Sequence, residues 1–149
     1  MPVMSVARFE RFFRLAASLD VDKNDLKRYS EFVNRKLYDL ILMGRDTAKW
    51  NGRDVIDAPD LPITKGLQER IHEFKDIDEE LELRPILDDL AARPPLDMVL
   101  SEEAERRLPL IAGGLSVALA RSFRIVDTDL KNPATQHWER AFRLFDLLL

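Results

Sequence analysis

Two short segments of the sequence contain residue types that can hold a metal ion. Glu69 and His72 have the spacing of the Glu-x-x-His step found in di-iron helical bundles. Such a site needs a second step of this kind, and His137 stands alone. The acidic run Asp76–Glu82 lacks the ligand spacing and central glycine of a calcium-binding EF-hand loop. We therefore predict no metal site and no cofactor, with His72 at a surface or interface and the acidic run as a solvated connection.

Residues for other catalytic chemistry are also missing. The 149 residues include no cysteine, which excludes disulfides, thiol nucleophiles and cysteine-bound zinc. No constellation of Ser, His and Asp suggests a nucleophile with its base, and Gly113-Gly114 is not part of a Gly-x-Gly-x-x-Gly phosphate loop. The sequence therefore predicts a protein that is not an enzyme.

Composition is typical of a globular chain with its own core. With 46% hydrophobic residues, residues 1–149 are expected to form a single domain. The lack of cysteine and of any apolar leader before Arg8 favours a cytoplasmic location. The longest uncharged run, residues 108–120, has 13 residues, whereas a membrane span needs about 20. This run is therefore expected to be a buried core helix.

Apolar periodicity predicts a short, a long and a short helix in the first half. The first covers residues 5–18. Asp22 can cap the second, a helix of nearly thirty residues that should end at Asn51-Gly52, because glycine tolerates the left-handed conformation. Asp60 and Pro62 then lead into a shorter third helix. Its apolar residues are Ile63, Leu67, Ile71 and Phe74.

The second half repeats this order. Its short first helix is predicted from Leu83, Ile86, Leu87 and Leu90. Ser101 begins a long helix that ends near Thr128, and Pro109 should kink this helix or delay its start. Asn132-Pro133 opens a last helix. Its apolar residues are Trp138, Ala141, Phe142, Phe145 and Leu149. No pattern indicates a β-strand.

Internal echoes support a duplication of this unit. Leu15-Ala16-Ala17 recurs as Leu90-Ala91-Ala92, which indicates repeats of about 5–75 and about 82–149. We expect Gly113-Gly114 to let the two long helices cross at short distance. The tryptophans, Trp50 and Trp138, lie on or next to apolar stripes and are expected in the core or an interface rather than stacked on bases.

The segment from Gly52 to Leu61 resembles the second loop of archaeal histones, where an arginine pairs with an aspartate seven positions later; Arg53 and Asp60 fit that spacing. Lys49–Asp54 and Asp60–Lys65 are similar to segments of a family of uncharacterised bacterial single-chain histone pseudo-dimers. The resemblance implies an all-α fold of two tandem histone-fold repeats, each with short, long and short helices, clasped as an intramolecular pseudo-dimer. It also implies a structural pair of Arg53 and Asp60.

The resemblance further implies where DNA would be contacted, because histone folds meet phosphates at the starts of their first helices and at their paired loops. In the first half those positions are Arg8, Arg11, Lys23, Lys27, Lys49 and Arg53. Asp54-Val55 replaces the Lys-Thr usual in archaeal histones. Residues 76–149 carry 9 Lys and Arg against 15 Asp and Glu, a net charge of −6, whereas residues 1–75 carry 14 against 12, a net of +2. Solvated helix faces are therefore favoured over a DNA footprint.

We expect a non-enzymatic histone-fold protein that acts through protein association, with at most weak, non-specific contact with double-stranded DNA. The alternative is a nucleoid-associated architectural DNA-binding protein, which would be located in the nucleoid. Neither hypothesis involves a membrane. The protein partner stays open, as does the choice between a monomeric pseudo-dimer and a homo-oligomer.

Overall fold

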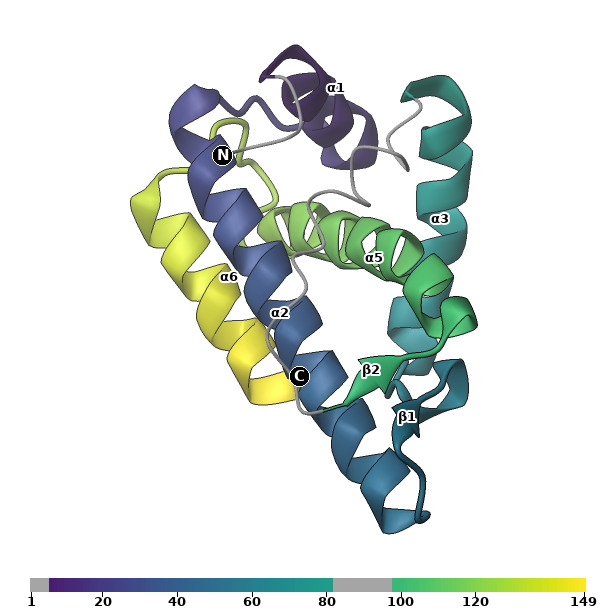
Figure 1. The fold of residues 1–149 in the computed structure, drawn as a ribbon. Helices are drawn as coiled ribbons and strands as arrows, with labels where there is room; N and C mark the ends of the chain where they lie inside the picture. The colour runs from purple at the N-terminus through teal and green to yellow at the C-terminus, as the bar shows by residue number, and fades with distance from the viewer. Residues whose placement is uncertain (1–5, 82–97) are drawn as a thin grey trace.

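The structure is a computed structural model that describes residues 6–81 and 98–149. Within these residues the chain forms five α-helices, one short 3-10 helix and a parallel sheet of two strands (Figure 1). In chain order the elements are α1 (Val6–Ala17), α2 (Lys23–Trp50), β1 (Val55–Ile56), η1 (Ala58–Asp60), α3 (Lys65–Leu81), β2 (Val99–Leu100), α5 (Glu102–Val126) and α6 (Thr135–Leu148). The prediction of a mostly helical chain is confirmed. The short helix predicted around residues 83–90 lies outside the described residues.

The long helix α2 begins and ends where the sequence predicts. The Asp22 carboxylate accepts hydrogen bonds from the backbone N–H groups of Asn24 and Asp25, and the Asp25 carboxylate accepts one from the Asp22 N–H at 3.1 Å. This capping box satisfies N–H groups that have no partner within the first turn. Beyond the other end, Gly52 has a φ of 69°, which glycine adopts without strain. The helix spans 28 residues, about 42 Å.

Helix α5 lies at the centre of the fold and packs against each of the other four described α-helices (Figure 1). Every residue from Ile111 to Val117 is buried, as expected of a helix covered on all sides. By length and composition α5 could also cross a membrane, but 61% of its most apolar window is buried inside the fold. Pro109 does not delay the start of the helix, because Ser101 caps it and accepts a hydrogen bond from the Ala104 N–H at 3.1 Å.

The core between α1, α2, α5 and α6 is rich in aromatic rings. Trp138 is fully buried, with its ring centroid 4.9 Å from that of Phe123, so the core position predicted for it is confirmed. The Tyr29 hydroxyl lies 2.8 Å from Ser116 Oγ. Because Ser116 donates its own hydrogen to the Ala112 carbonyl at 2.7 Å, Tyr29 must be the donor. This buried bond fixes α2 relative to α5.

Two glycines bring α5 close to α3. A Cβ atom on Gly113 would lie 2.3 Å from ring carbons of Phe74, and one on Gly114 would lie 2.6 Å from the Ile71 side chain. The prediction that Gly113 and Gly114 allow another helix to come close is therefore confirmed, but the predicted identity of that helix is wrong. The helix that approaches is α3, which runs to Leu81 and is longer than predicted, and not the other long helix.

Loops meet at both ends of the long helices. At one end β1 runs parallel to β2, with Val55 opposite Val99, and the Ser101 N–H donates to the Ile56 carbonyl at 2.8 Å. At the other end the Asp20 N–H donates to the Lys131 carbonyl at 2.6 Å. The prediction that the chain contains no strand is wrong. Two-residue strands arise from tertiary pairing and leave no periodic pattern in the sequence.

A buried lysine fastens α6 to α2. The Lys36 side chain is 2% exposed, and its Nζ lies 2.6 Å from Asp146 Oδ1 and 3.7 Å from Asp39 Oδ2. Arg35 Nη2 also donates to Asp146, at 2.5 Å. Hydrogen bonds from Lys36 and then Arg35 hold the pKa of the Asp146 carboxyl below its usual value. A buried ammonium group is tolerated here because it is paired.

Helix α6 begins at Thr135, two residues after the predicted Asn132-Pro133. The Ala134 N–H donates to Nδ1 of His137 at 2.9 Å. The imidazole thus takes the part that a glutamate plays in a capping box. His137, for which the sequence indicated no partner, has a structural role at this helix start.

Candidate functional site

The candidate site is the end of the fold where β1 pairs with β2, residues 49–61 and 98–103, which we call the paired-loop end. Arg53 Nη1 and Nη2 donate to the two carboxylate oxygens of Asp60 at 2.5 and 2.6 Å. Asp60 Oδ2 also accepts from the Asp57 N–H at 2.8 Å. The Asp60 side chain is 3% exposed and that of Arg53 is 42% exposed. Asp60 is therefore a buried acceptor, and the Arg53 guanidinium closes over it.

A second bond joins the two loops of this end. Ser101 Oγ donates to Asp57 Oδ1 at 2.9 Å while it accepts from the Ala104 N–H. One serine therefore both caps α5 and fastens it to η1. The sequence predicted the cap, but Asp57 lies 44 residues earlier in the chain and carries no local signal of this contact.

Replacing Asp60 by asparagine should destabilise the protein at pH 7 and make it less sensitive to acid. The hydrogen bonds from Arg53 hold the pKa of the Asp60 carboxyl below its usual value. A lowered pKa means that this contribution to stability is present above the unfolded-state pKa of about 3.9 and is lost as the pH falls through the folded-state value. Urea unfolding at pH 7 and near pH 3 measures both effects.

The double-mutant cycle with Arg53→Ala is the control for this prediction. The two substitutions should be strongly non-additive, because the side chains are bonded directly. Additive effects would show that Arg53 and Asp60 are not energetically coupled. The resemblance of this loop to that of archaeal histones would then not extend to a structural pair.

Three large apolar side chains are exposed at the paired-loop end. Trp50 is 91% exposed, Val99 is 67% exposed and Val55 is 40% exposed. Trp50 is therefore not in the core of this chain, and its alternative position, in an interface, stays a prediction. Trp50 is the last residue of α2. Its place directly before Asn51-Gly52 was the available signal, since residues at a helix end have few neighbours.

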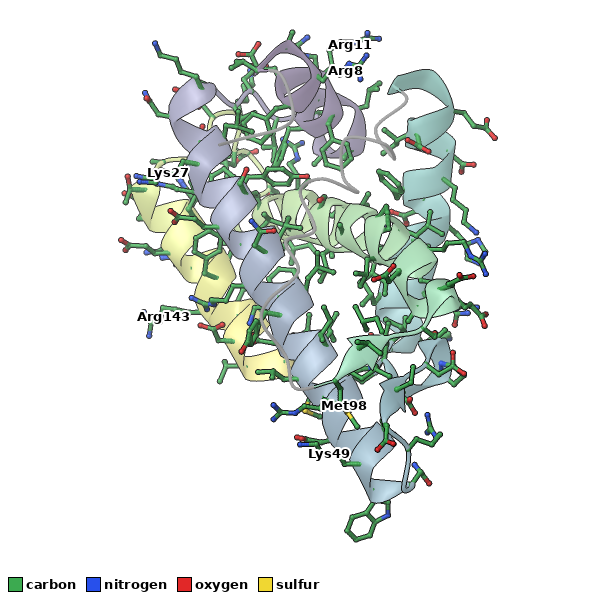
Figure 2. All side chains as sticks on the ribbon, in the orientation of Figure 1. Arg8, Arg11, Lys27, Lys49, Met98 and Arg143 are labelled. Carbon is green, nitrogen blue, oxygen red and sulfur yellow. The ribbon has the colours of Figure 1, made fainter. Side chains whose placement is uncertain are left out.

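Cationic groups at this end are few and partly neutralised. A shallow hollow of about 400 Å³ is lined by Lys49, Gly52, Arg53, Asp54 and Met98, and Figure 2 labels Lys49 and Met98 there. Arg53 is already bonded to Asp60, and Asp54 adds a carboxylate. At the start of α5, Glu102 and Glu103 are exposed. The hollow can offer a phosphate little more than the Lys49 ammonium group.

The six cations proposed for DNA contact fall into two groups. Arg8 and Arg11 lie on α1, and Lys23 and Lys27 lie at the start of α2, whereas Lys49 and Arg53 lie at its far end (Figure 2). All six are exposed. The length of α2, about 42 Å, separates the second group from the first. The structure therefore brings together two of the six at the paired-loop end.

Metal-binding groups do not cluster in the described part of the chain. Across residues 6–81 and 98–149, no set of three or more His, Cys, Asp and Glu residues is placed to hold a metal ion. His72 is exposed on α3.

These features define a largely helical protein with a central long helix and with loops paired at both ends. The chain belongs to the family described as a domain of unknown function (DUF1931), whose model matches residues 9–146.

Two sequence relatives and two solved structures are similar to the chain. Two uncharacterised proteins of Aquifex aeolicus (strain VF5) are 30% identical over 72% of this chain and 32% identical over 86% of it. The chain spans 63% of the length of the first relative and 82% of the second. A solved structure from Thermus thermophilus is 58% identical, covers 99% of both chains and has a TM-score of 0.87. Another, from Aquifex aeolicus, is 26% identical, covers 96% of this chain and 94% of its own, and has a TM-score of 0.82.

Proposed function

We propose that the protein is a single-chain histone pseudo-dimer that acts, without catalysis, by associating with another protein through the paired-loop end. The proposed pseudo-dimer fold is supported by contacts that the loops of the two halves make with each other at both ends. The loop after α2 pairs with the loop before α5, and the loop before α2 bonds to the loop after α5. Two clasped helical repeats require such exchange of loops at both ends. The Arg53 and Asp60 pair supports the same relation.

The observation that carries the functional part is the exposure of Trp50. Trp50, with an indole that is 91% exposed, lies at the same end of the fold as the exposed, paired valines Val55 and Val99, so this end presents apolar side chains to water. Such patches mark interaction sites, and tryptophan is prominent among residues that dominate binding energy at protein interfaces. A protein partner with an apolar hollow could bury all three side chains. A DNA duplex offers no comparable apolar surface at its phosphates.

Trp50→Ala should weaken association while it leaves the fold intact. The free energy of unfolding should change by no more than about 0.5 kcal/mol, because the side chain has few contacts to lose. Loss of a central interface tryptophan should weaken binding by about 2 kcal/mol, roughly thirty-fold. Partners are found by placing the photoreactive residue p-benzoylphenylalanine at position 50, with Arg143, exposed on another surface, as the matched control position (Figure 2). Binding of the cross-linked partner is then titrated with both proteins.

Acrylamide quenching gives an independent readout in the same titration. Trp138 is fully buried, so quenching reports on Trp50. A discrete protein adduct from position 50 but not from position 143, with protection of Trp50 from acrylamide, agrees with the proposal. Equal adducts from both positions, or unchanged affinity in Trp50→Ala, would reject it.

The second candidate function is architectural DNA binding, favoured by the exposed cations at the two ends of α2. Contact through about four phosphates would give a log–log salt slope near −3.6 and a non-specific Kd of roughly 10⁻⁴ to 10⁻⁶ M. Titration of a duplex at several salt concentrations separates the two functions. Nanomolar binding at physiological salt would make DNA architecture the leading function, whereas absence of binding at low salt would remove it.

A further inference from the structure

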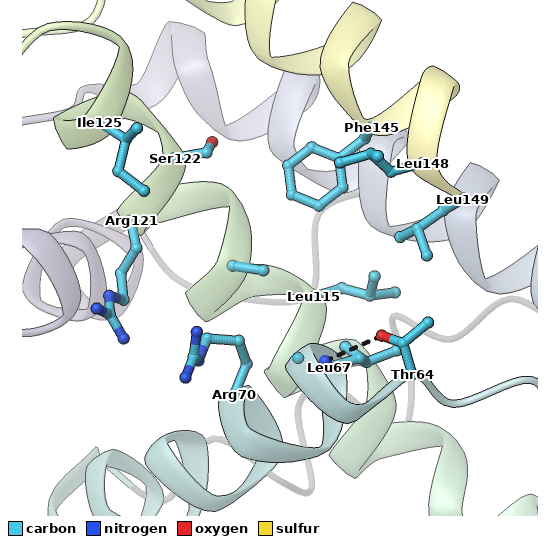
Figure 3. A pocket seen from close by; sticks show the side chains of 12 residues that line it. Thr64, Leu67, Arg70, Leu115, Arg121, Ser122, Ile125, Phe145, Leu148 and Leu149 are labelled. Carbon is cyan, nitrogen blue, oxygen red and sulfur yellow. Dashed lines mark hydrogen bonds between the residues drawn. The ribbon is translucent and has the colours of Figure 1, made fainter.

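A pocket of about 430 Å³ lies between α3, α5 and α6 (Figure 3). Its walls are mainly apolar, with Leu67 from α3, Leu115 and Ile125 from α5, and Phe145 and Leu148 from α6. Ile125 is 80% exposed and Leu148 is 79% exposed, so apolar surface at the rim faces water. Apolar pockets with a few polar groups are the usual form of small-molecule sites.

Two arginines mark one end of this pocket. Figure 3 shows Arg70 of α3 and Arg121 of α5 on one side, and Phe145, Leu148 and Leu149 on the other. Arg121 Nη1 donates to Glu73 at 2.5 Å, and Arg70 Nη2 lies 3.2 Å from Glu73. Both guanidinium groups therefore share one carboxylate, Glu73, and both line the pocket. Among the described residues, the Nε atom of Arg70 has no hydrogen-bond partner, so this guanidinium group is not saturated.

The charge around this end favours an anion. Among the described residues, the ion-pair network contains the cations Lys65, Arg70 and Arg121 and the carboxylates Glu69 and Glu73. These charges leave one positive charge in excess. None of the residues that line the pocket carries a carboxylate side chain. A carboxylate would balance this positive charge, and it can accept hydrogen bonds from the guanidinium groups that line the pocket.

We propose that this pocket binds a medium-chain aliphatic carboxylate. Its head group accepts hydrogen bonds from Arg70 and Arg121, and its hydrocarbon chain lies against Leu115 and Phe145. At about 30 Å³ for each water-sized group, the volume holds roughly a dozen non-hydrogen atoms. Decanoate has this size. The site is separate from the paired-loop end, and this inference does not depend on the proposed protein association.

Isothermal titration calorimetry of the full chain with sodium decanoate, below its critical micelle concentration, tests the proposal. We expect saturable binding of one decanoate per chain. The neutral 1-decanol and the cationic decyltrimethylammonium should each bind about ten-fold more weakly, because neither supplies the charged acceptor. Arg70→Gln should weaken decanoate binding by about ten-fold as well, whereas the matched Arg143→Gln, outside the pocket, should leave it unchanged.

A second variant keeps the test decisive if Arg70→Gln fails to fold. Ala118 lines the pocket, and Ala118→Phe should fill it and abolish decanoate binding. Circular dichroism establishes that each variant is folded. The proposal is overturned by the absence of saturable binding, by equal affinity for decanoate and decanol, or by wild-type affinity in folded Ala118→Phe.

Discussion

Gly113→Ala is expected to lower the free energy of unfolding by about 2 kcal/mol or more. The new Cβ would lie 2.3 Å from the Phe74 ring, so α3 and α5 must separate or the buried ring must leave its place. Neither adjustment is easy, because Phe74 is fully buried at the centre of this contact. The gain in helix propensity from glycine to alanine, up to about 1 kcal/mol, offsets part of the cost. Chemical denaturation measures the difference.

Gly66→Ala is the matched control for this substitution. Gly66 lies in α3, and a Cβ atom there would have no neighbour within 4 Å. The same chemical change should therefore stabilise the protein by about 0.5–1 kcal/mol through propensity alone. Phe74→Leu should relieve part of the Gly113→Ala defect, so the double variant should be more stable than the sum of the single effects predicts. Equal effects at positions 66 and 113 would mean that α3 does not approach α5 as closely as described.

Asp146→Ala is expected to cost about 2–3 kcal/mol at pH 7. Removal of one partner from a buried pair leaves the other charge uncompensated, which typically costs about 3–5 kcal/mol. Here the cost is reduced because the Asp146 side chain is 47% exposed and Asp39 stays 3.7 Å from the Lys36 ammonium. Asp39→Ala, which removes the more distant carboxylate, is the control and should cost less.

The pH dependence of this pair has a definite sign. Since the pKa of Asp146 is lowered by Lys36 and Arg35, its contribution is present above about pH 4 and is lost as the pH falls through the folded-state value. The deficit of Asp146→Ala against wild type should therefore shrink near pH 3. In addition, Lys36→Met in the Asp146→Ala background should recover stability, because a methionine fills the same space without a charge. If Asp146→Ala left the free energy of unfolding unchanged at every pH, the buried pair of Lys36 and Asp146 would be contradicted.

Local signals were sufficient to locate the described α-helices, although α3 is longer than they predicted. Asp22 and Gly52 mark the ends of α2 because capping and left-handed turns depend on neighbouring residues. Contacts between segments far apart in the sequence could not be predicted from such local signals. The pairing of Val55 with Val99 involves two residues per strand, and the approach of Phe74 to Gly113 depends on how α3 lies in space. The glycines indicated that some helix comes close, but not which one.

At the candidate site, too, contacts within one loop could be predicted, whereas the exposure or burial of single residues could not. Arg53 and Asp60 lie seven residues apart in one loop, so a resemblance of that loop was enough to suggest their contact. The exposure of Trp50 was missed because periodicity describes one face of a helix and not the point at which the fold stops covering it. The burial of Lys36 was also missed. It shares a helix face with Phe32, one turn earlier, but a lysine is ordinarily assumed to lie in solvent.

The loop pairings also determine when during synthesis this fold can form. The bond from Asp20 to Lys131 closes a stretch of 111 residues, and β1 cannot pair until β2 has left the ribosome. Contacts of such long sequence separation slow folding, because chain entropy must be lost before they form. Helices α1, α2 and α3 thus emerge first without the central α5 on which they pack. We expect the nascent first half to stay open and exposed to chaperones until nearly the whole chain has been made.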